Sequence, residues 1–163
     1  MRLPTRKSEI LEGTKKVSDA FLSPAAIQRY KNELQDLLKN QRQPAIKEVQ
    51  RTAEMGDFSE NAAYQMAKGR LRQINSRITI LEEKLKSAVV IKANTDGRVA
   101  LGSTVTFVMN GKETTYEILG VQEANPAHGK ISHLSPLGKA LLGKVVGEKF
   151  LFNNQTVEVV KVE

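Results

Sequence analysis

A seven-residue repeat of apolar side chains is the feature that most constrains this fold. The apolar positions alternate in steps of four and three, at Ala67, Leu71, Ile74, Ile78, Leu81, Leu85 and Ala88. Charged and amide side chains fill most of the positions between them. This spacing is the a/d pattern of a coiled coil, in which a helix buries one narrow stripe against a partner helix. The repeat therefore predicts a long helix that requires a helical partner.

The partner helix is expected from Ser23 to about Ala53. Ser23 suits an N-cap, and Pro24 suits the first helical position. Apolar residues then recur at helical spacing, at Ile27, Tyr30, Leu34, Leu37, Leu38, Ile46, Val49 and Ala53. Pro44 lies inside this segment and should bend the helix, because it lacks a backbone donor. A helix of about 30 residues rises ~45 Å, which predicts a long, thin arm.

The connection between the two helices is short, so the sequence predicts an antiparallel hairpin over residues 23–88 with its tip near residues 54–61. Gly56 suits the end of the first helix, in a left-handed conformation. Asp57 is expected to cap the second helix, with Glu60 three residues later as in a capping box. Residues 1–22 are expected to form a loose or partly helical extension.

From about residue 88 the apolar period changes to two, which is typical of strands. Strands are expected at residues 88–92, 103–109, 114–119, 130–134, 148–152 and 155–162. Asn110-Gly111 predicts a hairpin turn. A short helix is expected from Ser135 and Pro136 to Gly143. The fold class predicted is α+β, a coiled-coil hairpin followed by a mostly antiparallel sheet domain over residues 89–163.

Composition narrows the function. The net charge is +7, and most of the excess lies before residue 91. Such an excess indicates contact with a nucleic acid (RNA or DNA) or with an acidic protein surface. Alternatively, it is only the charge of a solvated helix face. The chain has no Cys, and its only two histidines, His128 and His133, are interpreted as ordinary surface or sheet residues. No apolar run approaches the ~20 residues of a membrane span, and no signal peptide is recognisable. A cytoplasmic monomer is expected.

Basic and acidic residues occupy different parts of the hairpin. Eight basic side chains flank the connection, Lys39, Arg42, Lys47, Arg51, Lys68, Arg70, Arg72 and Arg77. Glu54, Asp57 and Glu60 lie at the connection itself. Neighbouring carboxylates can hold a divalent cation through oxygen ligands and so act on a phosphodiester. Alternatively, Asp57 and Glu60 are only a capping pair, and the two roles are compatible.

The segment from Gly56 to Tyr64 resembles the tip signature of the Gre transcript cleavage factors, Gly-Asp, two variable residues, Glu-Asn-Ala, an acidic residue and Tyr. The segment from Ile131 to Lys144 is similar to the second signature of that family. The resemblance covers about residues 23–162. It implies a factor that is not itself an enzyme but enters the secondary channel of bacterial RNA polymerase and stimulates the polymerase to cleave backtracked RNA at its 3′ end.

Within this resemblance, Asp57 and Glu60 match the catalytic acids, which hold a Mg²⁺ shared with the polymerase active site only in the bound state. Gly56, Asn61 and Tyr64 match residues that shape the tip. The tip also has apolar side chains, which either contact the channel walls or hold the turn locally, at Met55 and Phe58.

The sheet domain resembles an FKBP-like fold that docks at the channel rim, and Ser135 and Pro136 match the docking loop. Two positions depart from the family pattern. Leu134 stands where Asp or Asn is frequent, and Ala63 replaces an acidic residue. On the hairpin shaft, four basic residues either contact the extruded RNA or form a solvated face, Lys68, Arg70, Arg72 and Arg77. Arg70 and Arg72 cannot share one helix face.

Three other functions remain open at the sequence level. A channel-binding inhibitor or regulator would share the architecture without cleaving RNA. A peptidyl-prolyl isomerase would need an aromatic pocket, whereas the aromatic residues of the sheet domain have the spacing of ordinary core, at Phe107, Tyr116, Phe150 and Phe152. A coiled-coil adaptor or nonspecific nucleic-acid binder would explain the repeat and the charge but not the acids at the turn.

Overall fold

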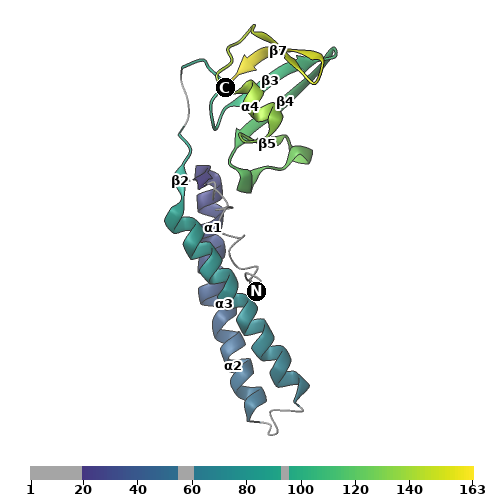
Figure 1. The fold of residues 1–163 in the computed structure, drawn as a ribbon. Helices are drawn as coiled ribbons and strands as arrows, with labels where there is room; N and C mark the ends of the chain where they lie inside the picture. Colours follow the sequence, from purple (N-terminus) through teal and green to yellow (C-terminus); the bar gives the residue numbers. More distant parts are fainter. Residues whose placement is uncertain (1–19, 55–60, 93–95) are drawn as a thin grey trace, which may run out of the picture.

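The computed structural model describes residues 20–54, 61–92 and 96–163. The molecule is elongated, with a helical hairpin at one end and a small sheet domain at the other (Figure 1). This arrangement confirms the α+β class predicted from the sequence. None of the described helices is both long and apolar enough to span a bilayer.

The first arm of the hairpin is a continuous helical run in three parts. It comprises α1 (Pro24–Asp36), the π-helical segment η2 (Leu37–Gln41) and α2 (Arg42–Ala53). Ser23 is the N-cap of α1, as predicted, and its hydroxyl accepts the N–H of Ala26 at 3.1 Å. The π-helical segment directly precedes the turn that contains Pro44. A proline lacks the N–H and crowds the carbonyl four residues earlier, which the wider π turn accommodates.

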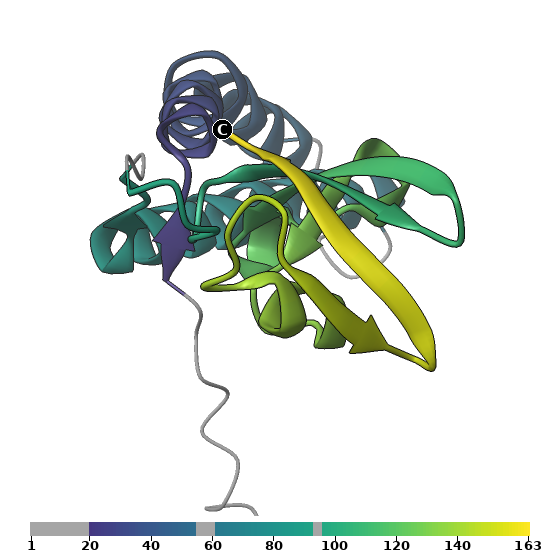
Figure 2. The same cartoon turned by 90° about the horizontal axis from the view of Figure 1, so that it is seen from above.

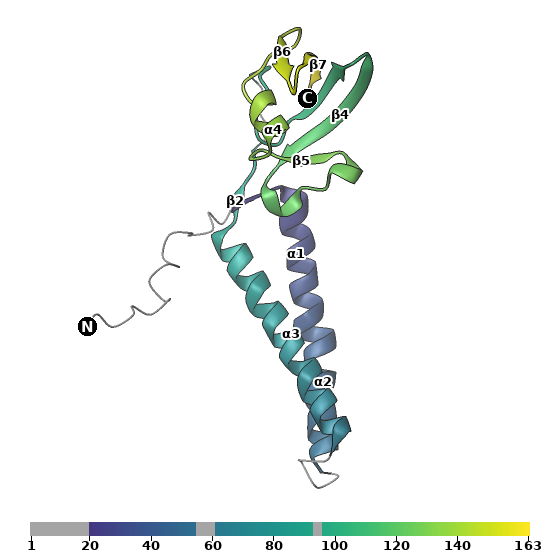
Figure 3. The same cartoon turned by 45° about the vertical axis from the view of Figure 1, so that its right-hand side comes forward.

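The second arm, α3 (Ala62–Ser87), runs antiparallel beside the first (Figure 3). The predicted seam faces the partner arm: Ile74, Ile78 and Leu81 are buried in the shared core. Its other members are buried or pack against that core, at Ala67, Leu71, Leu85 and Ala88. The first arm contributes Ala26, Tyr30, Leu37 and Ala45. The coiled-coil prediction is therefore confirmed.

The sheet domain has five strands in the order β5-β4-β3-β7-β6. They are β3 (Thr104–Met109), β4 (Lys112–Leu119), β5 (Lys130–Ser132), β6 (Lys149–Phe152) and β7 (Gln155–Val162). Within this sheet the β4–β5 pair is parallel, and the β3–β4, β3–β7 and β6–β7 pairs are antiparallel. Between β4 and β6 lie η3 (Val121–Glu123), η4 (Pro126–His128) and the helix α4 (Pro136–Leu141). In the view from above, the sheet domain lies in front and the hairpin helices extend behind it, away from the viewer (Figure 2).

Asparagines make both tight hairpin turns of the sheet. Asn110 and Gly111 have φ of 53° and 72°, the left-handed pair that a two-residue turn requires, so the predicted β3–β4 hairpin is confirmed. Asn153 and Asn154, with φ of 49° and 61°, make the equivalent turn between β6 and β7. The second turn was readable from its Asn-Asn pair but was not singled out in the sequence.

The base of the hairpin differs from the prediction. A strand was expected at residues 88–92 as part of the sheet domain, but β2 (Val89–Val90) pairs in parallel with β1 (Phe21–Leu22) instead. Leu22 is 1% exposed and belongs to the core of the hairpin, although residues 1–22 were expected to be a loose or partly helical extension. Burial of Leu22 and main-chain pairing with β2 hold Phe21 and Leu22 in place.

Candidate functional site at the hairpin tip

The tip of the hairpin lies at the end of the molecule farthest from the sheet domain (Figure 1). The helix α2 ends at Ala53, with Glu54 exposed at its C-cap, and α3 begins at Ala62. Five of the tip residues singled out in the sequence lie outside the described residues, namely Met55, Gly56, Asp57, Phe58 and Glu60.

Asn61 joins the two helix ends at this tip. Its side-chain oxygen accepts the N–H of Tyr64 at 3.0 Å, which makes Asn61 the N-cap of α3. Its side-chain nitrogen donates to the carbonyl oxygen of Thr52 at 2.9 Å. The last four carbonyls of a helix have no partner within the helix, and the Thr52 carbonyl is one of these in α2. One amide therefore serves both arms.

The prediction that Asp57 caps the second helix is wrong, because the N-cap of α3 is Asn61. Asn and Asp are about equally good N-caps, but only the amide also has a donor. The side-chain N–H of Asn61 donates a hydrogen bond to the Thr52 carbonyl oxygen. Both Asp57 and Glu60 precede the N-cap of α3 in the chain, so neither is needed in that capping role.

Further contacts support the tip from the helix sides. Thr52 is 1% exposed, and its hydroxyl donates to the carbonyl oxygen of Glu48 at 2.8 Å. Tyr64, in the first turn of α3, is half-buried, and the Lys68 ammonium lies 5.8 Å from its ring centroid. The residues predicted to shape the tip and described in the structure, Asn61 and Tyr64, are thus both engaged at the start of α3.

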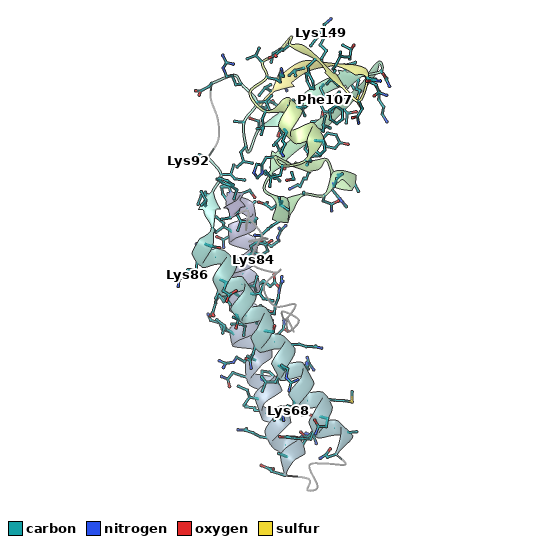
Figure 4. All side chains as sticks on the ribbon, in the orientation of Figure 1. Lys68, Lys84, Lys86, Lys92, Phe107 and Lys149 are labelled. Carbon is teal, nitrogen blue, oxygen red and sulfur yellow. The ribbon has the colours of Figure 1, made fainter. Side chains whose placement is uncertain are left out.

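The basic residues proposed for RNA contact do not form one group. Lys68, Arg70 and Arg72 are exposed along α3, with Lys68 toward the tip and Lys84 toward the base (Figure 4). Arg77 instead forms a bidentate ion pair across the hairpin with Glu33 of α1, at 2.7 and 3.0 Å. The hydrogen bond from Arg77 lowers the pKa of the Glu33 carboxyl, and the same bond raises the pKa of Arg77. The charge of Arg77 is therefore balanced within the hairpin.

The loop predicted for docking begins the helix α4. The Ser135 hydroxyl accepts the N–H of Gly138 at 3.0 Å and donates to the carbonyl oxygen of Ser132 at 2.6 Å, so Ser135 is the predicted N-cap. Gly138 is required here, since an added Cβ would collide with that Ser132 oxygen. Gly138 is a residue that sequence reasoning missed, although the Ser-Pro-x-Gly pattern could have indicated it. The loop leaves Leu134 and Pro136 exposed.

The aromatic side chains of the sheet domain belong to its core. Phe107, labelled in Figure 4, is 0% exposed. Three further aromatic side chains pack against the same cluster, those of Tyr116, Phe150 and Phe152. This packing against the core counts against the isomerase interpretation, which requires an aromatic pocket for proline. Among the described residues, no three or more His, Cys, Asp or Glu side chains gather where they could hold a metal ion.

Both halves of the chain match models of transcription elongation factors. Residues 20–90 match the "Transcription elongation factor, N-terminal" family, and residues 94–163 match "Transcription elongation factor, GreA/GreB, C-term". The transcription elongation factor GreA of Bacillus anthracis is 39% identical over 144 residues, which cover 83% of this chain and 91% of the relative. GreA of Leuconostoc mesenteroides is 43% identical over 120 residues, which cover 71% and 75%.

Solved structures with similar chains include GreA factor homolog 1 (Gfh1) of Thermus thermophilus, at 28% identity and a TM-score of 0.41, with 88% of this chain and 97% of the other covered. A GreA/GreB factor from Nitrosomonas europaea has 22% identity and a TM-score of 0.38 over 87% and 97%.

The family matches and the curated relatives define a transcription elongation factor. The chain belongs to the GreA/GreB family. These names describe a factor that acts in transcription and not an enzyme with a reaction of its own, in agreement with the prediction from the sequence.

Proposed function

We propose that this chain stimulates bacterial RNA polymerase to cleave its own backtracked transcript. The hairpin, residues 23–88, carries the acidic tip through the secondary channel, and the sheet domain, residues 89–163, docks at the channel rim. The observation that supports this proposal best is the capping of α3 by Asn61, because it leaves Asp57 and Glu60 without that structural duty.

The tip acids are proposed to act on the polymerase active site. Asp57 and Glu60 would hold a Mg²⁺ shared with the polymerase, since carboxylate oxygens are ligands that Mg²⁺ prefers. When bound, this ion would polarise the phosphodiester and lower the pKa of a water. Two carboxylates leave most of an octahedral shell to the polymerase and the RNA. Gly56, Met55 and Phe58 would shape the tip or contact the channel walls.

The shaft and the sheet domain have separate proposed roles. Lys68, Arg70 and Arg72 would contact phosphates of the extruded RNA 3′ end, because such contacts are made mainly by Lys and Arg. Arg77 instead links the two arms of the hairpin through its ion pair with Glu33. Ser135 and Pro136 would contact the channel rim, and the factor would bind there as a monomer. Leu134 would make an apolar contact with the rim in place of a polar one. DNA binding gains no support from the family or the relatives, and the proposal does not include it.

The experiment is transcript cleavage in a stalled, backtracked elongation complex with labelled RNA. The wild type is compared with Asp57→Asn/Glu60→Gln at equal polymerase occupancy. The wild type is expected to shorten the RNA, and the double variant to bind but lose at least ~100-fold in rate, because metal positioning contributes several kcal/mol. The isolated factor with Mg²⁺ and naked RNA is expected to cleave nothing.

Two results would contradict the proposal. If neither protein cleaves and both slow elongation, the chain is a regulator that blocks the channel. If the isolated factor cleaves naked RNA, the metal site is complete without the polymerase. The proposal that the Mg²⁺ is shared with the polymerase would then be wrong.

A further inference from the structure

One carboxylate of the sheet domain closes the base of the hairpin. Glu123, in η3, accepts the backbone N–H of Ser23 at 2.6 Å with one oxygen and the Ser23 hydroxyl at 2.6 Å with the other. The two residues lie 100 positions apart in the chain. Because Ser23 is the N-cap of α1, a residue of one domain completes the helix cap of the other.

The contact replaces a bond that helices normally make locally. In a capping box, a Glu or Gln at the third helical position reaches back to the N–H of the N-cap residue. That position in α1 is Ala26, and the first turn of α1 has no acidic residue. Glu123 supplies the missing bond, and its negative charge lies at the positive end of the helix dipole. The start of α1 is therefore complete only when the sheet domain is in this place.

A second contact lies beside the first. The Phe21 ring of β1 meets the His133 ring edge to face, with the centroids 5.8 Å apart and the planes at 87°. His133 is held by its backbone N–H, which donates to the Leu119 carbonyl at 2.9 Å. Two contacts of different kinds, one polar and one aromatic, restrict rotation at the base of the hairpin.

We propose that Glu123 is a positioning residue that fixes the sheet domain in one orientation relative to the hairpin. Its bonds to Ser23 thereby set the direction in which the long hairpin extends from the sheet domain, which contains the docking loop (Figure 1). On an arm of about 40 Å, a rotation of about 10° at the base displaces the tip by about 7 Å. Only the consequence for transcript cleavage rests on the proposed function.

The orientation is tested in the free protein by spin-label distances. The chain has no Cys, so Gln35→Cys and Thr156→Cys, both at exposed positions, place one label on each domain. Ser23→Asp is the sharpest variant, because Asp caps α1 as well as Ser but brings a second carboxylate against Glu123. Glu123→Gln removes the charge and puts a donor against one of the two Ser23 donors. The control is Glu113→Gln, which removes an exposed charge of the same domain.

A narrow distance distribution is expected for the wild type and Glu113→Gln, and a broad or shifted one for Ser23→Asp and Glu123→Gln, with helix content unchanged by circular dichroism. Equally narrow distributions in all four proteins would overturn the proposal.

In the cleavage assay, the same two variants are expected to need roughly five- to tenfold more factor for half-maximal cleavage, with an unchanged rate at saturation, because a preorganised factor loses less entropy on binding. An unchanged half-maximal concentration would overturn the consequence for docking. If the wild type does not cleave, competition for polymerase binding measures the same concentration, so the two proposals fail separately.

Discussion

The two ends of the hairpin hold their helix termini with different chemistry. At the base, Ser23 caps α1 and is itself held by a carboxylate from another domain, Glu123. At the tip, Asn61 caps α3 and donates to Thr52, nine residues away. The acid at the base is thus committed to structure, whereas the acids at the tip are not needed as the N-cap of α3.

The partners explain which side chain each end uses. Both groups offered by Ser23 are donors, an N–H and a hydroxyl, and a carboxylate accepts both. At the tip one partner is a donor, the N–H of Tyr64, and the other is an acceptor, the carbonyl of Thr52. An amide can serve both, and a carboxylate cannot. Whether an acidic residue near a helix terminus caps that helix therefore depends on its hydrogen-bond partners and not on sequence spacing alone.

Asn61→Ala should produce the largest loss of stability among the tip variants. It removes the cap of α3 and leaves the Thr52 carbonyl without its donor, which together cost about 1–2 kcal/mol. Unfolding in urea, followed by circular dichroism, measures this loss. A free energy of unfolding equal to that of the wild type would show that another residue caps α3.

Asn61→Asp separates the two bonds of Asn61. Asp retains the bond to the Tyr64 N–H but cannot donate to Thr52, so a smaller loss of about 0.5–1 kcal/mol is expected in the same urea experiment. If Asn61→Asp is as stable as the wild type, an acid suits this end as well as an amide, and the contrast with Glu123 disappears.

Glu33→Gln should have a smaller, pH-dependent effect on the hairpin shaft. The side chains of Arg77 and Glu33 are 43% and 36% exposed, so solvent screening limits the contribution of their ion pair to below about 1 kcal/mol. The Arg77 hydrogen bond keeps the pKa of Glu33 below its usual 4.5 in the folded protein. Such a carboxyl stabilises the fold above its unfolded pKa and loses this effect as the pH falls through the folded value.

Urea unfolding of the wild type and Glu33→Gln, in neutral buffer and at about pH 3, checks this expectation. The difference between the two proteins should be present in neutral buffer and shrink in acid. A difference that grows in acid would contradict the assigned direction of the pKa shift.

The sequence predicted the hairpin well because its seam is local and periodic. The spacing of Ile74, Ile78 and Leu81 is enough to predict which face of the helix is buried. The strand at residues 88–92 was also expected, but its pairing with Phe21 and Leu22 was missed, since periodicity does not identify the partner of a short strand. The contact between Ser23 and Glu123 was beyond sequence reasoning for the same reason, because the fold alone brings such distant residues together.

The capping error at the tip has a different cause. Asp57 with Glu60 fits the capping-box spacing, and Asn61 fits an N-cap for a helix that begins four residues later equally well. The choice depends on the Thr52 carbonyl across the connection, which needs a donor. Sequence spacing contains no information about that carbonyl.

The central claim is that Asp57 and Glu60 act on the polymerase and do not hold the hairpin. The most direct measurement is the free energy of unfolding of Asp57→Ala/Glu60→Ala, combined with its transcript cleavage. We predict that unfolding changes by less than about 0.5 kcal/mol, as for surface substitutions, while cleavage is lost. A loss of about 1 kcal/mol or more in unfolding, as for a removed helix cap, with cleavage retained would contradict the claim.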